Sequence, residues 1–268
     1  WNPAGLAQVE EHQFLSMYAP FFEGTSYNFI SYVHPLRRLG NFAISDVFLY
    51  SGGYEEVSAA GEPSGTTSSV WKNAVIISYG NRIHRRISLG ASLKLINEQV
   101  MGYSGSGQGI DLGILYKPLD RLSIGLAVQN VLQPSVTLRY EPDVYRVNLK
   151  GGVALRMLSN VVTLTADINK LVDEKAYFAF GAEISPWEKI YGSSLNRVDL
   201  RLGVNHLQTI TMGIGLNIKY LSLDYAYNPQ WIGGLHRFGL TFRWGSIYKA
   251  RVNPVSYTHL RAHETVLD

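Results

Sequence analysis

Hydrophobic and polar residues alternate along most of this chain. In the segment 122–130, Leu122, Ile124 and Leu126 fall on one face, while small or polar residues fall on the other. The segment 210–218 repeats this pattern with different residues. A period of two over seven or more positions is typical of a β-strand, because a helix places its apolar residues three and four positions apart. The pattern predicts an all-β protein.

About fourteen segments of this kind follow one another, separated by turn residues. An even number favours a closed antiparallel transmembrane β-barrel, whose two ends meet on one side of the membrane. The first four segments alternate less cleanly, since Phe42, Ile44 and Phe48 share one face but Val47 and Leu49 lie on the other. The predicted strands are 11–19, 24–34, 40–50, 69–80, 86–99, 108–117, 121–130, 144–157, 160–169, 175–186, 196–206, 209–218, 220–228 and 235–244.

The connections between these strands tend to alternate in length. Outer-membrane barrels have short periplasmic turns and longer loops outside the cell. The predicted short turns are 35–40, 117–121 and 158–160, and the predicted long loops are 51–68, 101–108 and 132–143. Two connections depart from the rule, because 187–195 is long where a turn is expected and 206–208 is short where a loop is expected.

Composition separates a membrane barrel from a soluble β-sandwich, which also alternates. Charged residues make up only 17% of the chain, which contains 26 Gly and 17 Tyr. The polar face consists mainly of Gly, Ser, Ala, Thr and Asn, whereas solvated faces are richer in Lys and Glu. The apolar face also persists to the last strand, while a sandwich has weaker edge strands. These features favour the membrane barrel, with aromatic girdles at its two interfaces.

If the apolar face meets lipid, the other face lines the lumen. The charged residues on this inward face include both acidic and basic side chains, so ion pairs between neighbouring strands are expected. Two interpretations stay open: ladders that satisfy a wet or plugged interior, or a selectivity lining. The lumen-facing candidates are Lys94, Asp111, Lys117, Arg146, Lys150, Arg156, Asp199, Arg201, Asp224 and Arg243.

Two segments carry a resemblance to a known family. Residues 1–7, Trp-Asn-Pro-Ala-Gly-Leu-Ala, resemble the segment near the N-terminal plug of FadL-like outer-membrane proteins. The stretch 213–229 and the closing strand 236–244 resemble the PorV/PorQ branch of that superfamily. The resemblance implies a 14-stranded barrel with an N-terminal hatch in its lumen. It places Asn2, Pro3 and Ala4 where the hatch meets the barrel wall.

The resemblance also implies a function. PorV-like members act in type IX secretion, so we expect a component that binds secreted cargo proteins at the outer membrane. The alternative is a FadL-like passive transporter of hydrophobic small molecules, which would have a continuous apolar pocket. A third reading is a structural envelope barrel without transport. Outer-membrane lipid is a partner in each case, and the bacterial outer membrane is the expected location.

The ends of the chain are interpreted separately. Residues 1–10 are expected to be a remnant of the hatch, 11–245 the barrel, and 246–268 a tail outside the family pattern. From about residue 254 the tail resembles translated sequencing-adapter read-through, and we expect it to be artefactual. The signal peptide is presumed lost by truncation before Trp1.

No catalytic or metal-binding motif is found in the sequence. Cysteine is absent, there is no nucleophile elbow, and His259 and His263 have no further ligand beside them. The segment 105–109, Gly-Ser-Gly-Gln-Gly, opens no helix, so a flexible loop is expected rather than a phosphate site. A net charge of +3 is too small for a nucleic-acid partner. We expect no enzyme, no cofactor and no metal.

Overall fold

The computed structural model describes residues 1–22, 24–36, 39–57, 61–186, 196–205, 209–230 and 233–245. The predicted tail 246–268 and the connections 187–195 and 206–208 lie outside these residues. One short 3-10 helix, η1 (Pro3–Gln8), precedes the strands. Within the described residues, no helix is long and apolar enough to cross a bilayer.

Fourteen of the strands close into one antiparallel barrel, so the predicted fold class and strand number are confirmed. β1 pairs with β16 at the closing seam, where Ser16 lies opposite Leu240, and a two-sheet sandwich is therefore excluded. The strands are β1 (His12–Pro20), β2 (Ser26–Leu36), β3 (Gly40–Val57), β4 (Pro63–His84), β5 (Ile87–Val100), β6 (Tyr103–Leu119), β7 (Leu122–Leu132), β8 (Ser135–Thr137), β9 (Pro142–Val144), β10 (Asn148–Met157), β11 (Val162–Leu171), β12 (Tyr177–Ile184), β13 (Asn196–Val204), β14 (Ile210–Ile218), β15 (Leu221–Gln230) and β16 (Gly233–Trp244).

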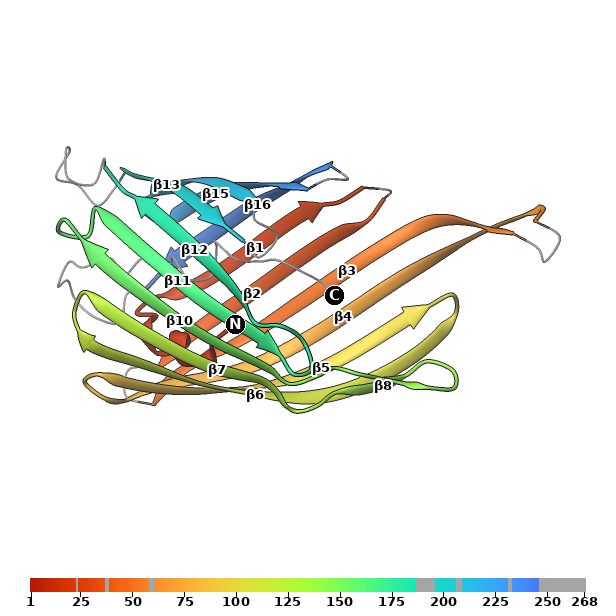
Figure 1. Cartoon of the computed structure of the whole chain (residues 1–268), viewed down its shortest axis with the longest axis horizontal. Coiled ribbons are helices and arrows are strands. Elements are labelled where there is room, and N and C mark those ends of the chain that lie inside the picture. Colours follow the sequence, from red (N-terminus) through yellow and green to blue (C-terminus); the bar gives the residue numbers. More distant parts are fainter. Residues whose placement is uncertain are drawn as a thin grey trace.

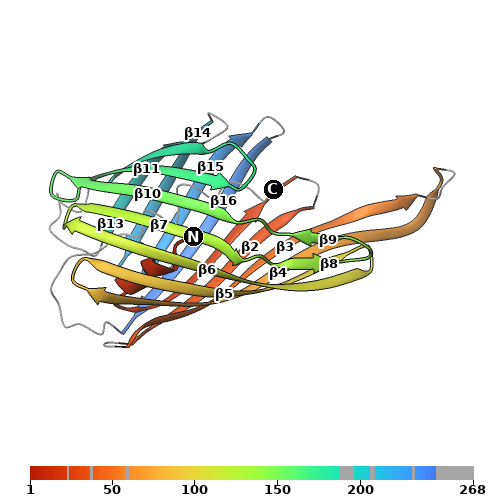
Figure 2. The same cartoon turned by 60° about the horizontal axis from the view of Figure 1, so that its bottom comes forward.

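The two ends of the barrel differ in shape (Figure 1). We call the end where β1 begins and β16 finishes proximal, and the opposite end distal. At the distal end, β3 to β6 reach well beyond the other strands, and the β3–β4 hairpin reaches furthest (Figures 1 and 2). The barrel wall is therefore tall on one side and short on the other.

The outer surface of the barrel is apolar. Leu126 and Leu202 are each 56% exposed, and Ile214 on β14 is 47% exposed. Inward-facing neighbours such as Ser92 and Ser123 are buried. Alternation therefore directs the large apolar side chains outward, as expected for strands in contact with lipid.

Two of the predicted long loops are wrong, because the strands continue through them. β3 and β4 stay paired to Val57 and Pro63, and β5 and β6 are joined by a two-residue turn of Met101 and Gly102. Both turn residues have positive φ, at 49° and 84°, as in the turns that suit the twist of a hairpin. The segment 105–109 is consequently part of β6 and not a flexible loop.

The third predicted loop, 132–143, contains a small hairpin of its own. β8 and β9 pair with each other and with no strand of the barrel. We call residues 133–145 the tongue. It lies on the inner face of β6 and explains why that strand is rich in glycine. A Cβ atom at Gly105 would lie 2.6 Å from the carbonyl oxygen of Thr137, and one at Gly109 2.5 Å from Cγ of Pro134.

Candidate functional site

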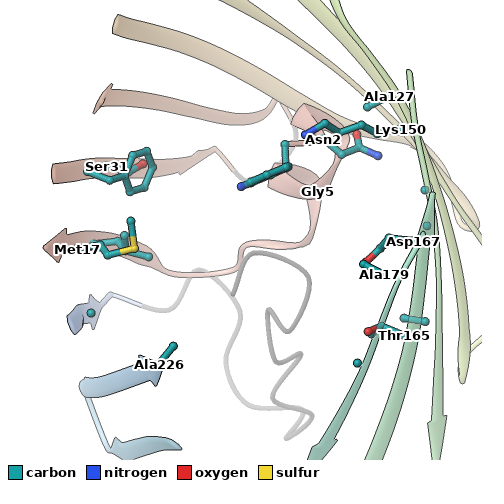
Figure 3. Close-up of a pocket in the computed structure, with 18 of the residues that line it drawn as sticks. Asn2, Gly5, Met17, Ser31, Ala127, Lys150, Thr165, Asp167, Ala179 and Ala226 are labelled. Atoms are coloured by element: carbon teal, nitrogen blue, oxygen red, sulfur yellow. The ribbon is translucent and has the colours of Figure 1, made fainter. Parts of the chain in front are cut away.

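The interior of the barrel contains a cavity of about 540 Å³. Its distal part is lined by Tyr27 and Tyr177, and its proximal part by Gln13, Arg156 and Arg243. It therefore extends along most of the barrel. This volume lies within the range of about 300–1,000 Å³ that is usual for small-molecule sites. Figure 3 shows Met17 and Ser31 on one side of the cavity and Thr165 and Asp167 on the other.

Helix η1 lies inside the proximal half of the barrel on a row of glycines. Gly80, Gly90 and Gly113 are neighbours in register on β4, β5 and β6. A Cβ atom at Gly80 would lie 2.7 Å from the carbonyl oxygen of Pro3, and one at Gly90 would overlap the backbone of Pro3 and Ala4. We call this row the glycine seat. It lets the backbone of the N-terminal segment lie directly against the wall.

Two asparagines fix the N-terminal segment to the wall. The Asn2 side chain donates to the carbonyl oxygens of Ile114 and Leu126, at 3.0 and 3.1 Å. Its Oδ1 also accepts from the backbone N–H of Ala4, at 3.0 Å, so that it caps η1. At the other end, Asn41 donates to the carbonyl oxygens of Leu6 and Val9.

The predicted motif residues Asn2, Pro3 and Ala4 thus lie against β5, β6 and β7. Pro3 and Ala4 are buried. Next to them, the ammonium group of Lys150 lies 3.6 Å from the centre of the Trp1 ring, a cation–π contact. The segment therefore spans the inner surface from Asn41 on β3 to Lys150 on β10.

The strands on one side of the cavity present apolar side chains to the interior. Met17, Phe29 and Val47 lie opposite one another in register on β1, β2 and β3, and all three line the cavity. Leu15 on β1 and Ile76 on β4 line the cavity one inward position nearer the proximal end, at the two ends of a row that contains Ser31 and Ser45. We call the five apolar residues the apolar belt. Because these strands carry apolar residues on both faces, their alternation is weak in the sequence.

The opposite wall is polar and charged. Arg201 on β13 bonds to Glu183 at 2.8 Å, Asp224 at 2.9 Å and Asp199 at 3.1 Å. Arg197 bonds to Glu183 at 3.1 Å and to Asp199 at 2.5 Å. The side chains of Glu183 and Asp199 are only 5% and 2% exposed. We call these five residues the arginine network.

A missing side chain gives Arg201 access to Asp224. Gly215 on β14 lies between the strands that carry the two residues. A Cβ atom there would lie 2.9 Å from the guanidinium nitrogens of Arg201 and 2.8 Å from Oδ1 of Asp224. A smaller pair lies on the opposite part of the wall, where Lys94 meets Asp111 at 2.7 Å.

A buried carboxylate holds the tongue to the distal wall. Glu98 is 2% exposed, accepts a hydrogen bond from the hydroxyl of Tyr145 and lies 3.2 Å from the ammonium group of Lys72. Burial, together with the bond to Glu98, raises the pKa of the Tyr145 hydroxyl above its ordinary value. At the tip, the guanidinium of Arg139 lies 5.0 Å from the centre of the Tyr103 ring.

The predicted lumen residues are placed in four ways. Arg146 lies at the distal rim, where it forms an exposed ion pair with Asp173 at 3.2 Å, and Asp199 is enclosed in the arginine network. Lys117 lies on β6 near the proximal end. The others line the cavity: Lys94, Asp111, Lys150, Arg156, Arg201, Asp224 and Arg243.

Sequence reasoning missed several residues of this interior. Glu98 and Glu183 lie on predicted inward faces, and the period of two could have identified both. The apolar belt gave only one signal, the weak alternation of the first strands. Among the described residues, no cluster of three His, Cys, Asp or Glu side chains could hold a metal ion.

Comparisons with known structures match the fold at low sequence identity. No family model matches the chain, and no curated protein matches it in sequence. The toluene transporter TbuX of Ralstonia pickettii matches in structure with a TM-score of 0.59 and 14% identity, over 91% of this chain and 92% of that one. A Pseudomonas aeruginosa FadL homologue matches with a TM-score of 0.61 and 10% identity, over 91% and 93%.

A third match is the toluene transporter TodX of P. putida, with a TM-score of 0.59 and 11% identity, over 91% of this chain and 92% of that one. Identities this low describe the fold alone. The chain has the fold of FadL-like outer-membrane barrels. None of these three matches is named as a PorV or PorQ protein, and the PorV/PorQ branch stays a prediction.

Proposed function

We propose that this protein is a passive channel for hydrophobic small molecules in a bacterial outer membrane. The observation that carries the proposal is the cavity that runs along the barrel past the apolar belt. Apolar solutes gain about 25 cal/mol for each Å² of apolar surface removed from water, so the belt provides a favourable path. The structural neighbours TbuX and TodX, which are toluene transporters, and a FadL homologue support the same class of solute.

The hatch enters this proposal as a fixed plug. The glycine seat and the two asparagine anchors attach η1 to one side of the wall. A solute would therefore pass beside η1, between the apolar belt and β10 to β12, rather than displace it.

A shape-conserving change of the belt tests the proposal. Met17→Gln and Val47→Thr keep the side-chain volumes and make the belt polar, so uptake of a labelled monoaromatic hydrocarbon by cells expressing the protein should fall. Thr165→Val, on the opposite wall of the same cavity, is the matched control and should leave uptake unchanged or raise it. Equal uptake by the belt variants and the wild type would contradict the proposal.

The membrane location has a separate test. Because the outward surface is apolar, the expressed chain should sediment with outer membranes and need detergent for extraction. Recovery as soluble protein without detergent would overturn the channel and the location together.

A secretion-associated role is the second candidate. The β3–β4 hairpin favours it, because its distal part, beyond Tyr50 and Val70, pairs with neither β2 nor β5 and stands clear of the barrel. Such a hairpin offers open strand edges to a folded partner. Purification from native outer membrane should then recover secreted cargo proteins that share a C-terminal domain. Recovery of none would leave the channel as the remaining function.

A further inference from the structure

The cations of the lumen are not all neutralised. The cavity is lined by six basic and four acidic side chains. Within the described residues, Lys150 and Arg156 have no carboxylate oxygen within ion-pair distance. Lys150 contacts the Trp1 ring, and Arg156 donates to the backbone oxygen of Asp120 at 3.1 Å. Neither cation is therefore in direct contact with a carboxylate in the described part of the chain, and Asp111 and Asp167 act on Lys150 only from a greater distance.

Three of the four acidic side chains are held in ion pairs. Asp111 lies 2.7 Å from Lys94. Glu183 and Asp224 both bind Arg201, at 2.8 and 2.9 Å. A paired carboxylate repels an anion only weakly, because its partner cancels most of its field at a distance. The fourth acidic side chain is Asp167, so six basic against four acidic side chains leave the lining with a formal net charge of +2.

The two cations mark a track along one strand. Lys150 and Arg156 lie on the inward face of β10, separated on that face by Gly152 and Ala154. Ser123 on β7 and Thr165 on β11, which flank Ala154, are small and line the cavity. Asp167 on β11 lies opposite Gly152 in register and is a carboxylate beside the track. In Figure 3, Lys150 lies beside Asn2 at the edge of the hatch, and Thr165 lies further along the same wall.

The track continues towards the proximal opening. Arg156 itself lines the proximal part of the cavity, and Arg243 on β16 lines it at the same end. Helix η1 packs against β3 to β6, so it does not cover the part of β10 that carries the track. Small inward side chains and unpaired cations thus coincide beside the hatch.

We propose that the barrel also passes small inorganic anions, of the size of chloride, along the Lys150–Arg156 track. Rings or rows of Lys and Arg select anions in pores, because they attract the permeating ion and repel cations. This activity does not depend on the apolar belt and is separate from the passage of hydrophobic solutes.

The test is ion selectivity of the full chain in planar lipid bilayers under a KCl gradient. For the wild-type protein, the reversal potential should be shifted from zero towards the equilibrium potential of chloride. The double variant Lys150→Gln/Arg156→Gln should lose that preference, and Lys150→Arg/Arg156→Lys, which keeps both charges, should retain it. Arg156→Gln alone should reduce the preference without altering the contact of Lys150 with Trp1. Lys219→Gln removes one charge at an exposed turn outside the lumen and is the matched control.

Several results would overturn the proposal: no current from folded wild-type protein, a current without chloride preference, or an equal shift in the Lys219→Gln control. Folding of each variant is checked by its heat-dependent migration on a gel. The hydrocarbon uptake assay is independent, so loss of anion selectivity with intact uptake would affect this inference alone.

Discussion

At the scale of single residues, the absence of a side chain can matter as much as its chemistry. The glycine seat holds the N-terminal segment because three neighbouring positions lack a side chain. The Oδ1 atom of Asn2 caps η1, and its Nδ2 atom donates to carbonyl groups of two wall strands. A short segment is thereby fixed without a large apolar contact.

Gly90→Ala should disturb this seat. Its Cβ atom would overlap the backbone of Pro3, and overpacking of this kind costs about 1–3 kcal/mol. We expect faster proteolysis of the N-terminal segment and a lower unfolding midpoint in urea, measured on protein refolded into vesicles. Gly5→Ala is the matched control, since nothing lies within 4 Å of its added methyl group. Equal sensitivity of both variants would contradict the seat.

Which residues face the lumen could be predicted from the sequence, but their partners could not. A period of two places Asp199, Arg201 and Asp224 on inward faces. Their contacts depend on the register of β13, β14 and β15, which the pattern within one strand does not contain. The reach of Arg201 past Gly215 is visible only once the strands are paired.

At the scale of elements, the arginine network coincides with the barrel's shortest ladder in the described residues. β12 and β13 are paired over five positions, from Phe180 to Ile184. Glu183 on β12 binds both Arg197 and Arg201 on β13. The network therefore adds side-chain bonds across a seam that has few backbone bonds, which favours the structural-ladder interpretation for these charges.

Glu183→Gln should weaken that seam. Removing one partner of a buried ion pair leaves uncompensated charge and costs roughly 3–5 kcal/mol. Asp173→Asn is the control, because its pair with Arg146 has side chains 69% and 56% exposed and should contribute about 0–1 kcal/mol. Urea unfolding in vesicles measures both. If Glu183→Gln lowered the free energy of unfolding no more than Asp173→Asn does, the proposed role of the network would be contradicted.

The tongue gives a second prediction at this scale. Gly107→Val would bring a branched side chain against Ser135 and Val136, since even a Cβ atom there lies 3.0 Å from each. Hydrogen exchange over residues 133–145 should become faster. Ser104→Val, at an exposed position of the same strand, should leave this exchange unchanged. Protection retained in Gly107→Val would place the tongue elsewhere.

The predicted strand positions agree well with the structure, and the errors have one cause. The segments 51–68 and 101–108 are rich in Gly and Ser, which is typical of loops. In β6 the glycines make room for the tongue, a contact with residues about thirty positions later in the chain. Composition within the segment cannot reveal such a contact.

At the scale of the whole molecule, the apolar exterior decides how the barrel responds to charge. Leu126→Arg places a cation in the middle of the outward face of β7 and should lower the free energy of unfolding by about 2–4 kcal/mol. Leu119→Arg, 63% exposed at the proximal end of β6, should cost about 0–1 kcal/mol. Urea unfolding in vesicles compares the two. Equal costs would show that the exterior does not lie in a bilayer.

The seam between β1 and β16 has a consequence for biogenesis. The strands that close the barrel, β1 and β16, are the first and the last of the described strands, so the ring cannot be completed until synthesis reaches Trp244. Until the ring closes, the sheet keeps unpaired strand edges, and other chains can pair with them. The free N–H and C=O groups of such an edge are also unfavourable in the hydrocarbon core of the bilayer. Nascent chains must therefore be kept apart during export, and a stop codon before β16 would produce an aggregating polypeptide rather than a smaller barrel.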